Sequence, residues 1–295
     1  SALEFCPFAR AGKAGCTNAP KRNEKRANDM KNSYTSEMRD SCRKAARADF
    51  LNIGANAKTV KNTKVGYLTG ILYLAPEKLS GRNVCSHATP GCIASCLNTA
   101  GQGRYDNVQA ARIAKTKLFY ASREEFWLHL ERSLEFLTKK AAKLGHKPSV
   151  RLNGTSDLPF EAFIVRDGKT IMELWPDVEF YDYTKVPKRM RKYLSGAMPA
   201  NYSLTFSYTE NNAAACSEFL ADGGTVAVVF EKELPAFFMG FPVVNGDEHD
   251  AINTRDGGTI LGLSAKGRAK QDTTGFVVRA SVPVAFCGIL DFIAA

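Results

Sequence analysis

The sequence contains no long hydrophobic run, and no stretch approaches the roughly eighteen apolar residues that a membrane-spanning helix needs. Residues 1–16, SALEFCPFARAGKAGC, have no positively charged start that leads into an apolar segment, so we expect no secretory signal. Both absences predict a cytoplasmic protein without a membrane partner. Because the cytoplasm is reducing and disfavours disulfides, we interpret the eight cysteines first as thiols or metal ligands.

Several catalytic signatures are also missing. The sequence has no H-E-x-x-H motif, and no order of Ser, His and Asp supports a peptidase or an esterase. No two cysteines have the C-x-x-C spacing that is usual for a redox-active dithiol. These absences leave metal binding as the favoured role for cysteines that lie close together.

Positive charge is present in excess, but it is unevenly distributed. Residues 1–64 contain fourteen Lys and Arg against six Asp and Glu, a net charge of +8, whereas the other 231 residues have a net charge of only +2. Such a basic segment suits a nucleic acid, because cationic side chains displace the counterions of the phosphates. A solvated helix face would have the same composition, and the segment contains few aromatic residues for base stacking. No feature identifies a protein partner.

From residue 65 onward, apolar strands alternate with amphipathic helices. The clearest helix spans residues 123–144, with Ser122 as the expected N-cap and Gly145 as its end. Strands are predicted at residues 65–76, 149–154, 178–184, 202–208, 225–230, 259–263 and 275–279, and helices at residues 107–122, 186–194 and 210–222. This βα alternation predicts an α/β domain over residues 65–295, in the form of a complete or partial (β/α) barrel of the TIM type, with an open doubly wound sheet as the alternative. Residues 1–64 are expected to form a mainly helical basic extension that ends in an irregular connection over residues 52–64.

The segment VCSHATPGCIASCLNTAGQG, residues 84–103, brings Cys85, Cys92 and Cys96 together within twelve residues. Its C-x6-C-x3-C spacing and small residues predict a loop that could wrap a metal. Three thiolates fit an iron–sulfur cluster with a fourth, non-cysteine ligand, or a zinc ion completed by His87 or a remote residue. Buried thiols without a metal are the structural alternative. The basic segment contains three further cysteines, whose spacing is too wide to indicate a second metal site: Cys6, Cys16 and Cys42.

The order of several motifs resembles that of phage proteins in the family called gene product eighty-eight, and of a related phage family with a radical S-adenosylmethionine type of fold. In those families a three-cysteine loop precedes a short Gly-Arg-aromatic segment, a strand with a polar end, and a later strand of the FYxYTK kind. The matching pieces here are TPGCIASC, GQGRY, RLNGTSD and FYDYTKVPKRM, within residues 67–211.

The resemblance implies a 4Fe–4S cluster on Cys85, Cys92 and Cys96, with one iron open to bind S-adenosylmethionine. It also implies an enzyme that generates an organic radical by reductive cleavage of that cofactor. The spacing of the cysteines differs from the usual C-x3-C-x2-C pattern of radical enzymes.

Polar residues follow three of the predicted strands, where the sites of parallel α/β proteins form. Asp157, Asp182 and Lys185 are the candidate catalytic residues. The candidate cofactor-binding residues are Asn153, Ser156, Asp157, Ser207 and Glu210. Turn formation and helix capping are the structural alternatives for most of them.

Three functions are compatible with these observations. The first is an iron–sulfur radical enzyme that acts on or binds a nucleic acid or nucleotide. The second is a zinc- or cluster-containing protein that binds nucleic acid without catalysis. The third is a hydrolase in which Asp157, Glu161 and Asp182 hold a hard metal ion.

Overall fold

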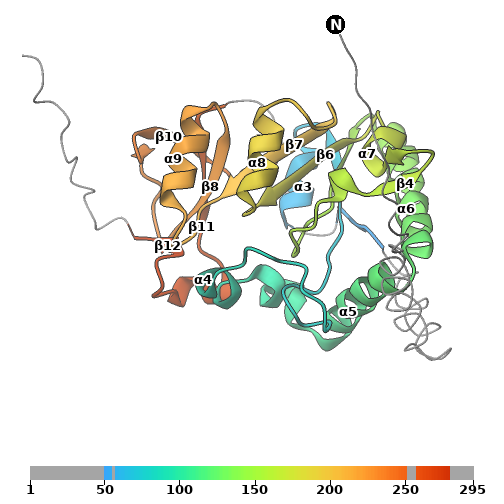
Figure 1. Cartoon of the computed structure of the whole chain (residues 1–295), viewed down its shortest axis with the longest axis horizontal. Helices are drawn as coiled ribbons and strands as arrows, with labels where there is room; N and C mark the ends of the chain where they lie inside the picture. Colours follow the sequence, from blue (N-terminus) through green and yellow to red (C-terminus); the bar gives the residue numbers. More distant parts are fainter. Residues whose placement is uncertain (1–49, 55–56, 251–256, 280–295) are drawn as a thin grey trace, which may run out of the picture.

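The computed structural model describes residues 50–54, 57–250 and 257–279 (Figure 1). Its main feature is a ten-stranded sheet in the order β1-β2-β3-β6-β7-β8-β11-β10-β9, with β12 also paired to β8. The parallel strands are β2 (Tyr67–Ile71), β3 (Lys147–Arg151), β6 (Glu179–Thr184), β7 (Tyr202–Ser207), β8 (Thr225–Phe230), β10 (Phe241–Asn245), β11 (Thr259–Ser264) and β12 (Val277–Val278). The edge strands β1 (Asn52–Ile53) and β9 (Phe237–Phe238) run antiparallel to their neighbours.

The order of the strands shows how the chain winds. From β2 to β8, each new parallel strand is added on the same side of the one before it. A doubly wound sheet would reverse its order near the middle, whereas the sheet of a barrel does not. Within the described residues, the edge strands β1 and β9 do not pair with each other, so no closure of a barrel is found. The predicted α/β class with a mostly parallel sheet is confirmed.

Most of the longer helices occur at the residues where the sequence predicted them. Helix α6 (Arg123–Leu144) begins at Ser122, whose hydroxyl accepts a hydrogen bond from the Glu125 N–H, and ends at Gly145 with a φ of 65°. Because that left-handed conformation costs glycine little, it provides a natural stop. The helices α5 (Asp106–Ala121), α8 (Pro187–Leu194) and α9 (Ala213–Ala221) also match the prediction. The sequence did not predict α3 (Ala57–Thr63) or α7 (Ile171–Leu174).

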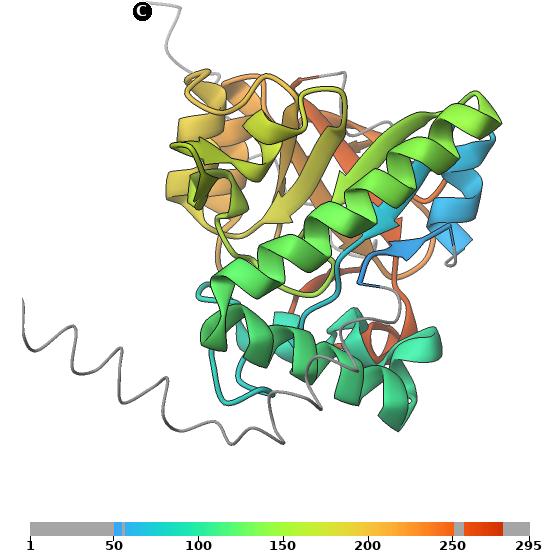
Figure 2. The ribbon, with the colours of Figure 1, turned by 90° about the vertical axis from the view of Figure 1, so that its right-hand side faces the viewer.

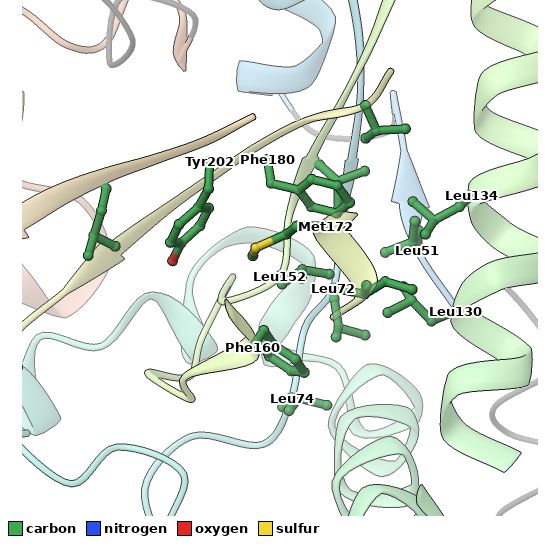
Figure 3. Close-up of a cluster of buried hydrophobic side chains, with 14 of the residues drawn as sticks. Leu51, Leu72, Leu74, Leu130, Leu134, Leu152, Phe160, Met172, Phe180 and Tyr202 are labelled. Carbon is green, nitrogen blue, oxygen red and sulfur yellow. The ribbon is translucent and has the colours of Figure 1, made fainter. Parts of the chain in front are cut away.

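The core lies between the sheet and the helices. Leu130 and Leu134 of α6 are fully buried, and Figure 3 shows Leu130 beside Leu72 and Leu134 beside Leu51. Burial of each such side chain stabilises the fold by roughly 1.5–3 kcal/mol. Phe50 belongs to the same core, with its ring 5.1 Å from that of Phe126. From Phe50 onward, the described part of the predicted N-terminal extension therefore packs against the sheet. Residues 1–49, with the predicted basic helix and Cys6, Cys16 and Cys42, lie outside the described residues.

The three-cysteine segment differs from the predicted loop, because it contains short helices. These are α4 (Pro90–Ala94), the 3-10 turns η1 (Leu97–Thr99) and η2 (Gly101–Arg104), and they lie with α5 below the sheet in Figures 1 and 2. Small elements elsewhere are η3 (Phe160–Ala162), η5 (Gly267–Gln271) and a hairpin of β4 (Ile164–Arg166) and β5 (Lys169–Thr170). Among the described helices, none is long and apolar enough to cross a membrane.

Candidate metal centre

The three-cysteine segment contacts loops that follow successive parallel strands. The Cys85 thiol lies 3.8 Å from the Thr155 carbonyl oxygen, in the loop after β3. Lys185, directly after β6, is close enough for its charge to lower the pKa of Cys96, although burial of that thiol raises the pKa more strongly. Glu210, in the loop after β7, hydrogen bonds to the start of α4. The segment thus lies across the carboxyl edge of the sheet, where the sequence placed the site.

Helix α4 begins at a well-capped N-terminus. The Thr89 hydroxyl accepts a hydrogen bond from the Cys92 N–H at 3.2 Å, and Pro90 occupies the first turn, where no intrahelical N–H bond is lost. Gly91 has no room for a side chain, because an added Cβ would lie 2.2 Å from the Thr274 hydroxyl oxygen. The TPGC motif therefore has a structural meaning: it starts the helix, packs it closely and places Cys92 on it.

Burial and mutual repulsion favour the protonated form of the thiols. Desolvation raises the pKa of Cys85 to about 12; the Glu77 N–H bond acts in the opposite direction, and the charges of Asp157, Cys96 and Cys92 add to the increase. Burial also raises the pKa of Cys96; Cys92 adds to this effect, while the Asn98 N–H, Lys185 and Arg112 oppose it. The three thiols are half-buried, free of disulfides and close enough for their charges to interact.

The donor set has the chemistry of a soft-metal site, with three sulfur atoms and backbone N–H donors beside two of them. The positions of these donors, however, do not form a complete metal site in the described residues. Across residues 50–54, 57–250 and 257–279, no three His, Cys, Asp or Glu side chains form a group that could hold a metal ion. His87, the proposed fourth zinc ligand, is exposed, and its Nδ1 lies 3.0 Å from the Ser86 hydroxyl. The ligand set thus stays a prediction.

Asn153 and Asp182 form a buried pair between β3 and β6. The Asn153 backbone N–H and side-chain amide donate to the two Asp182 carboxylate oxygens, at 2.7 and 2.9 Å. The Ser156 hydroxyl donates to the Asn153 Oδ1 at 2.8 Å. Desolvation raises the pKa of Asp182 to about 7, although the charge of Arg189 and the Asn153 hydrogen bonds act in the opposite direction. These three candidate residues use their polar groups to join neighbouring strands.

Arg189 of α8 connects two of the carboxylates. Its guanidinium donates to both Glu161 carboxylate oxygens at 2.8 Å and also bonds Asp157. Its third contact is the Tyr202 hydroxyl, at 2.8 Å. Arg189 is only 7% exposed, so this network is part of the interior. The Asp157 carboxylate also accepts from the Lys185 backbone N–H, which fixes the start of the loop after β6.

Of the remaining candidate residues, Lys185 lies near the three cysteines, and Ser207 contacts a side chain at the end of β7. The Lys185 ammonium lies 5.9 Å from the centre of the Phe276 ring and acts on Cys96, so it faces the three-cysteine segment. The Ser207 carbonyl accepts from the Asn212 side chain at 2.9 Å, at the end of β7. Sequence reasoning missed Arg112 and Arg189, although an arginine on the buried face of a helix is a recognisable signal.

The geometry defines a singly wound parallel α/β protein with a three-cysteine segment at the carboxyl edge of its sheet. The family described as gene product 88 matches residues 41–280, so the chain belongs to that family. Comparison with curated proteins and with solved structures found no match.

Proposed function

We propose that the protein is an iron–sulfur protein of the radical S-adenosylmethionine type, encoded by a bacteriophage and active in the host cytoplasm. In this proposal Cys85, Cys92 and Cys96 hold a 4Fe–4S cluster, and the sheet corresponds to a partial (β/α) barrel. When bound, the cluster would supply the electron for reductive cleavage of S-adenosylmethionine. The observation that supports this proposal best is the position of three interacting thiols from one segment at the carboxyl edge of a singly wound parallel sheet.

Two cationic residues beside Cys96 oppose the effect of burial on its thiol and so support an anionic centre there. Lys185 and Arg112 both favour the charged form of Cys96, which is the form that ligates metal. Glu210 holds the N-terminus of α4 and thereby the position of Cys92. The Asp157–Arg189–Glu161 network holds the loops after β3 and β6 on which the segment rests.

Metal analysis of protein purified without oxygen tests the proposal. We expect iron and acid-labile sulfide in similar amounts, both lost when Cys85, Cys92 or Cys96 becomes Ser. The matched control is Cys216→Ser, a change to a buried free cysteine of α9. Stoichiometric zinc in place of iron would contradict the radical enzyme and leave the zinc protein as the function. If S-adenosylmethionine does not bind to cluster-loaded protein, the cofactor part of the proposal is wrong.

We further propose that the basic N-terminal segment binds the nucleic acid on which the protein acts. The net charge of +8 over residues 1–64 supports this proposal. Because Phe50 belongs to the core, the test removes residues 1–49 only. DNA or RNA affinity should fall with added salt and with this truncation. A matched comparison changes Lys21, Arg22 and Lys25 to Gln, or instead the exposed Lys139, Lys140 and Lys143 of α6. Equal affinities in both variants would contradict the role of the segment.

A further inference from the structure

Arg112 is a buried cation that contacts the three-cysteine segment through Asn98. It lies on α5, is 7% exposed, and its charge acts on Cys96. Its Nη1 donates to the Asn98 carbonyl oxygen at 2.9 Å and also bonds the Asn98 side chain. Gln109, one turn earlier on α5, donates to the same carbonyl at 2.9 Å and accepts from the Asn98 amide. Asn98 and Gln109 therefore hold the guanidinium in a fixed orientation.

This arrangement leaves one edge of the guanidinium unused. The Arg112 Nε is fully buried and has no hydrogen-bond partner, and no bond of Nη2 is seen among the described residues. The ring of Tyr73 lies 4.7 Å from the Arg112 Cζ, so it contacts the guanidinium without satisfying its N–H groups. Nε and Nη2 together form the edge with which arginine binds a carboxylate or phosphate through two parallel hydrogen bonds.

Among the described residues, the charge of Arg112 interacts with the ionised forms of Tyr73 and Cys96, and no carboxylate forms an ion pair with it. Burial lowers the pKa of Arg112. Burying a cation without a partner is costly, and an unpaired buried N–H adds to that cost. A second buried polar atom without a partner, the Ser95 hydroxyl oxygen, lies in the residue before Cys96. The buried Arg112 Nε without a partner indicates that a polar ligand completes the hydrogen bonding of this guanidinium.

The surrounding residues hold the guanidinium in place around this buried edge. Gly103 packs against Asn98 so closely that an added Cβ would lie 2.2 Å from the Asn98 carbonyl oxygen and 3.1 Å from the Arg112 Nη1. Thr116, one turn after Arg112, accepts from the Ala75 N–H at 2.8 Å and so fixes α5 to the segment after β2. The guanidinium is therefore held from several sides, while its Nε edge stays without a protein partner.

We propose that the Nε–Nη2 edge of Arg112 is an oxyanion-binding site, which takes a carboxylate or phosphate group of a small ligand beside Cys96. The geometry suits a planar or tetrahedral oxyanion that accepts two hydrogen bonds and neutralises the guanidinium. The donors of this site belong to α5 and not to the cysteines, so they are present whether or not a cluster is bound. Its test therefore uses the full chain without metal, and a negative result would leave the cluster proposal untouched.

The test follows the Nε–Hε resonance of Arg112 by NMR of arginine-labelled protein. Sodium phosphate and sodium acetate are added separately against sodium chloride at equal ionic strength, so that the two arms distinguish phosphate from carboxylate. We expect a saturable shift of this resonance in at least one arm. Arg112→Lys keeps the charge but loses the two-donor edge, so it should bind the same ion about tenfold more weakly. Because this variant has no Nε–Hε group, its affinity is followed at the backbone amide of Asn98, the residue that contacts Arg112 in the wild type. The control is Arg104→Lys, a change to an exposed arginine of η2, which should bind as the wild type does.

Two results would overturn the site. The first is an Nε–Hε resonance that neither ion shifts. The second is a resonance that shifts when Cys96 becomes Ser but not with either ion, because Arg112 would then serve the thiol alone. The wild-type titration needs no folded variant, since the resonance can be assigned through its bonds to the backbone.

Discussion

The carboxylate of Glu210 accepts a hydrogen bond from the Thr89 hydroxyl, with 2.7 Å between the two oxygens. Its other oxygen accepts from the Gly91 N–H at 2.8 Å. A negative charge at this place also complements the exposed N–H groups of the first turn. Glu210 thus ties the loop after β7 to the start of α4, and the position of Cys92 depends on a residue more than a hundred positions away.

Replacement of Glu210 by Ala should loosen α4. The Gly91 N–H and the Thr89 hydroxyl lose their partner, so we expect the free energy of unfolding to fall by about 1–3 kcal/mol. Alkylation of Cys92 should become faster. Urea unfolding and timed alkylation measure the two effects. The control is Glu218→Ala, which removes an exposed partner of Arg191 and should cost less than about 1 kcal/mol. Equal effects of the two changes would show that the Glu210 contacts do not hold α4.

Arg189 and Arg191 provide a matched pair on one helix. Arg189→Met leaves Asp157 and Glu161 without their shared cation inside the protein, so we expect a loss of about 3–5 kcal/mol of stability. Arg191→Met breaks only a surface pair with Glu218, for which less than about 1 kcal/mol is expected. Denaturant unfolding compares the two. Similar losses would mean that the buried network contributes no more than the surface pair.

Asp182 should make stability depend on pH. Its folded pKa of about 7 exceeds the ordinary value of 3.8, so the folded state binds more protons between these two values. The contribution of Asp182 to the free energy of unfolding is therefore greatest below pH 3.8. It falls by about 1.4 kcal/mol per pH unit as the pH rises toward 7. Asp182→Asn removes the titrating group and should flatten this slope. Urea unfolding between pH 5 and 7 measures it; an unchanged slope in the variant would contradict the assignment to Asp182.

Local patterns were sufficient to predict much of the fold. Helix α6 followed from its apolar spacing, its Ser122 cap and Gly145, because these signals act within one turn of the chain. Strand β6 followed from FYDYT, and in the structure Tyr181 bonds Asp250 at 3.0 Å while Asp182 accepts from the Asn153 N–H. The short helix α4 was missed, because its cap depends partly on Glu210, which is distant in the sequence.

The contacts of the site residues were harder to predict, because they join segments that are distant in the sequence. The sequence located the three cysteines and the strand ends, and in the structure Lys185 is close enough to Cys96 for its charge to lower the pKa of that thiol. It could not show that Asn153 and Asp182 bind each other, since that pairing depends on the register of β3 and β6. Nor could it show that the Arg112 Nε is buried without a hydrogen-bond partner among the described residues, because burial depends on how α5 packs below the sheet.

The most direct test of the account is the absorbance spectrum of the full chain purified without oxygen, with iron and zinc counted in the same sample. We predict a brown protein with broad absorbance at about 400 nm that Cys96→Ser abolishes and Cys216→Ser retains. A colourless protein that contains stoichiometric zinc, or no metal at all, would contradict the iron–sulfur centre.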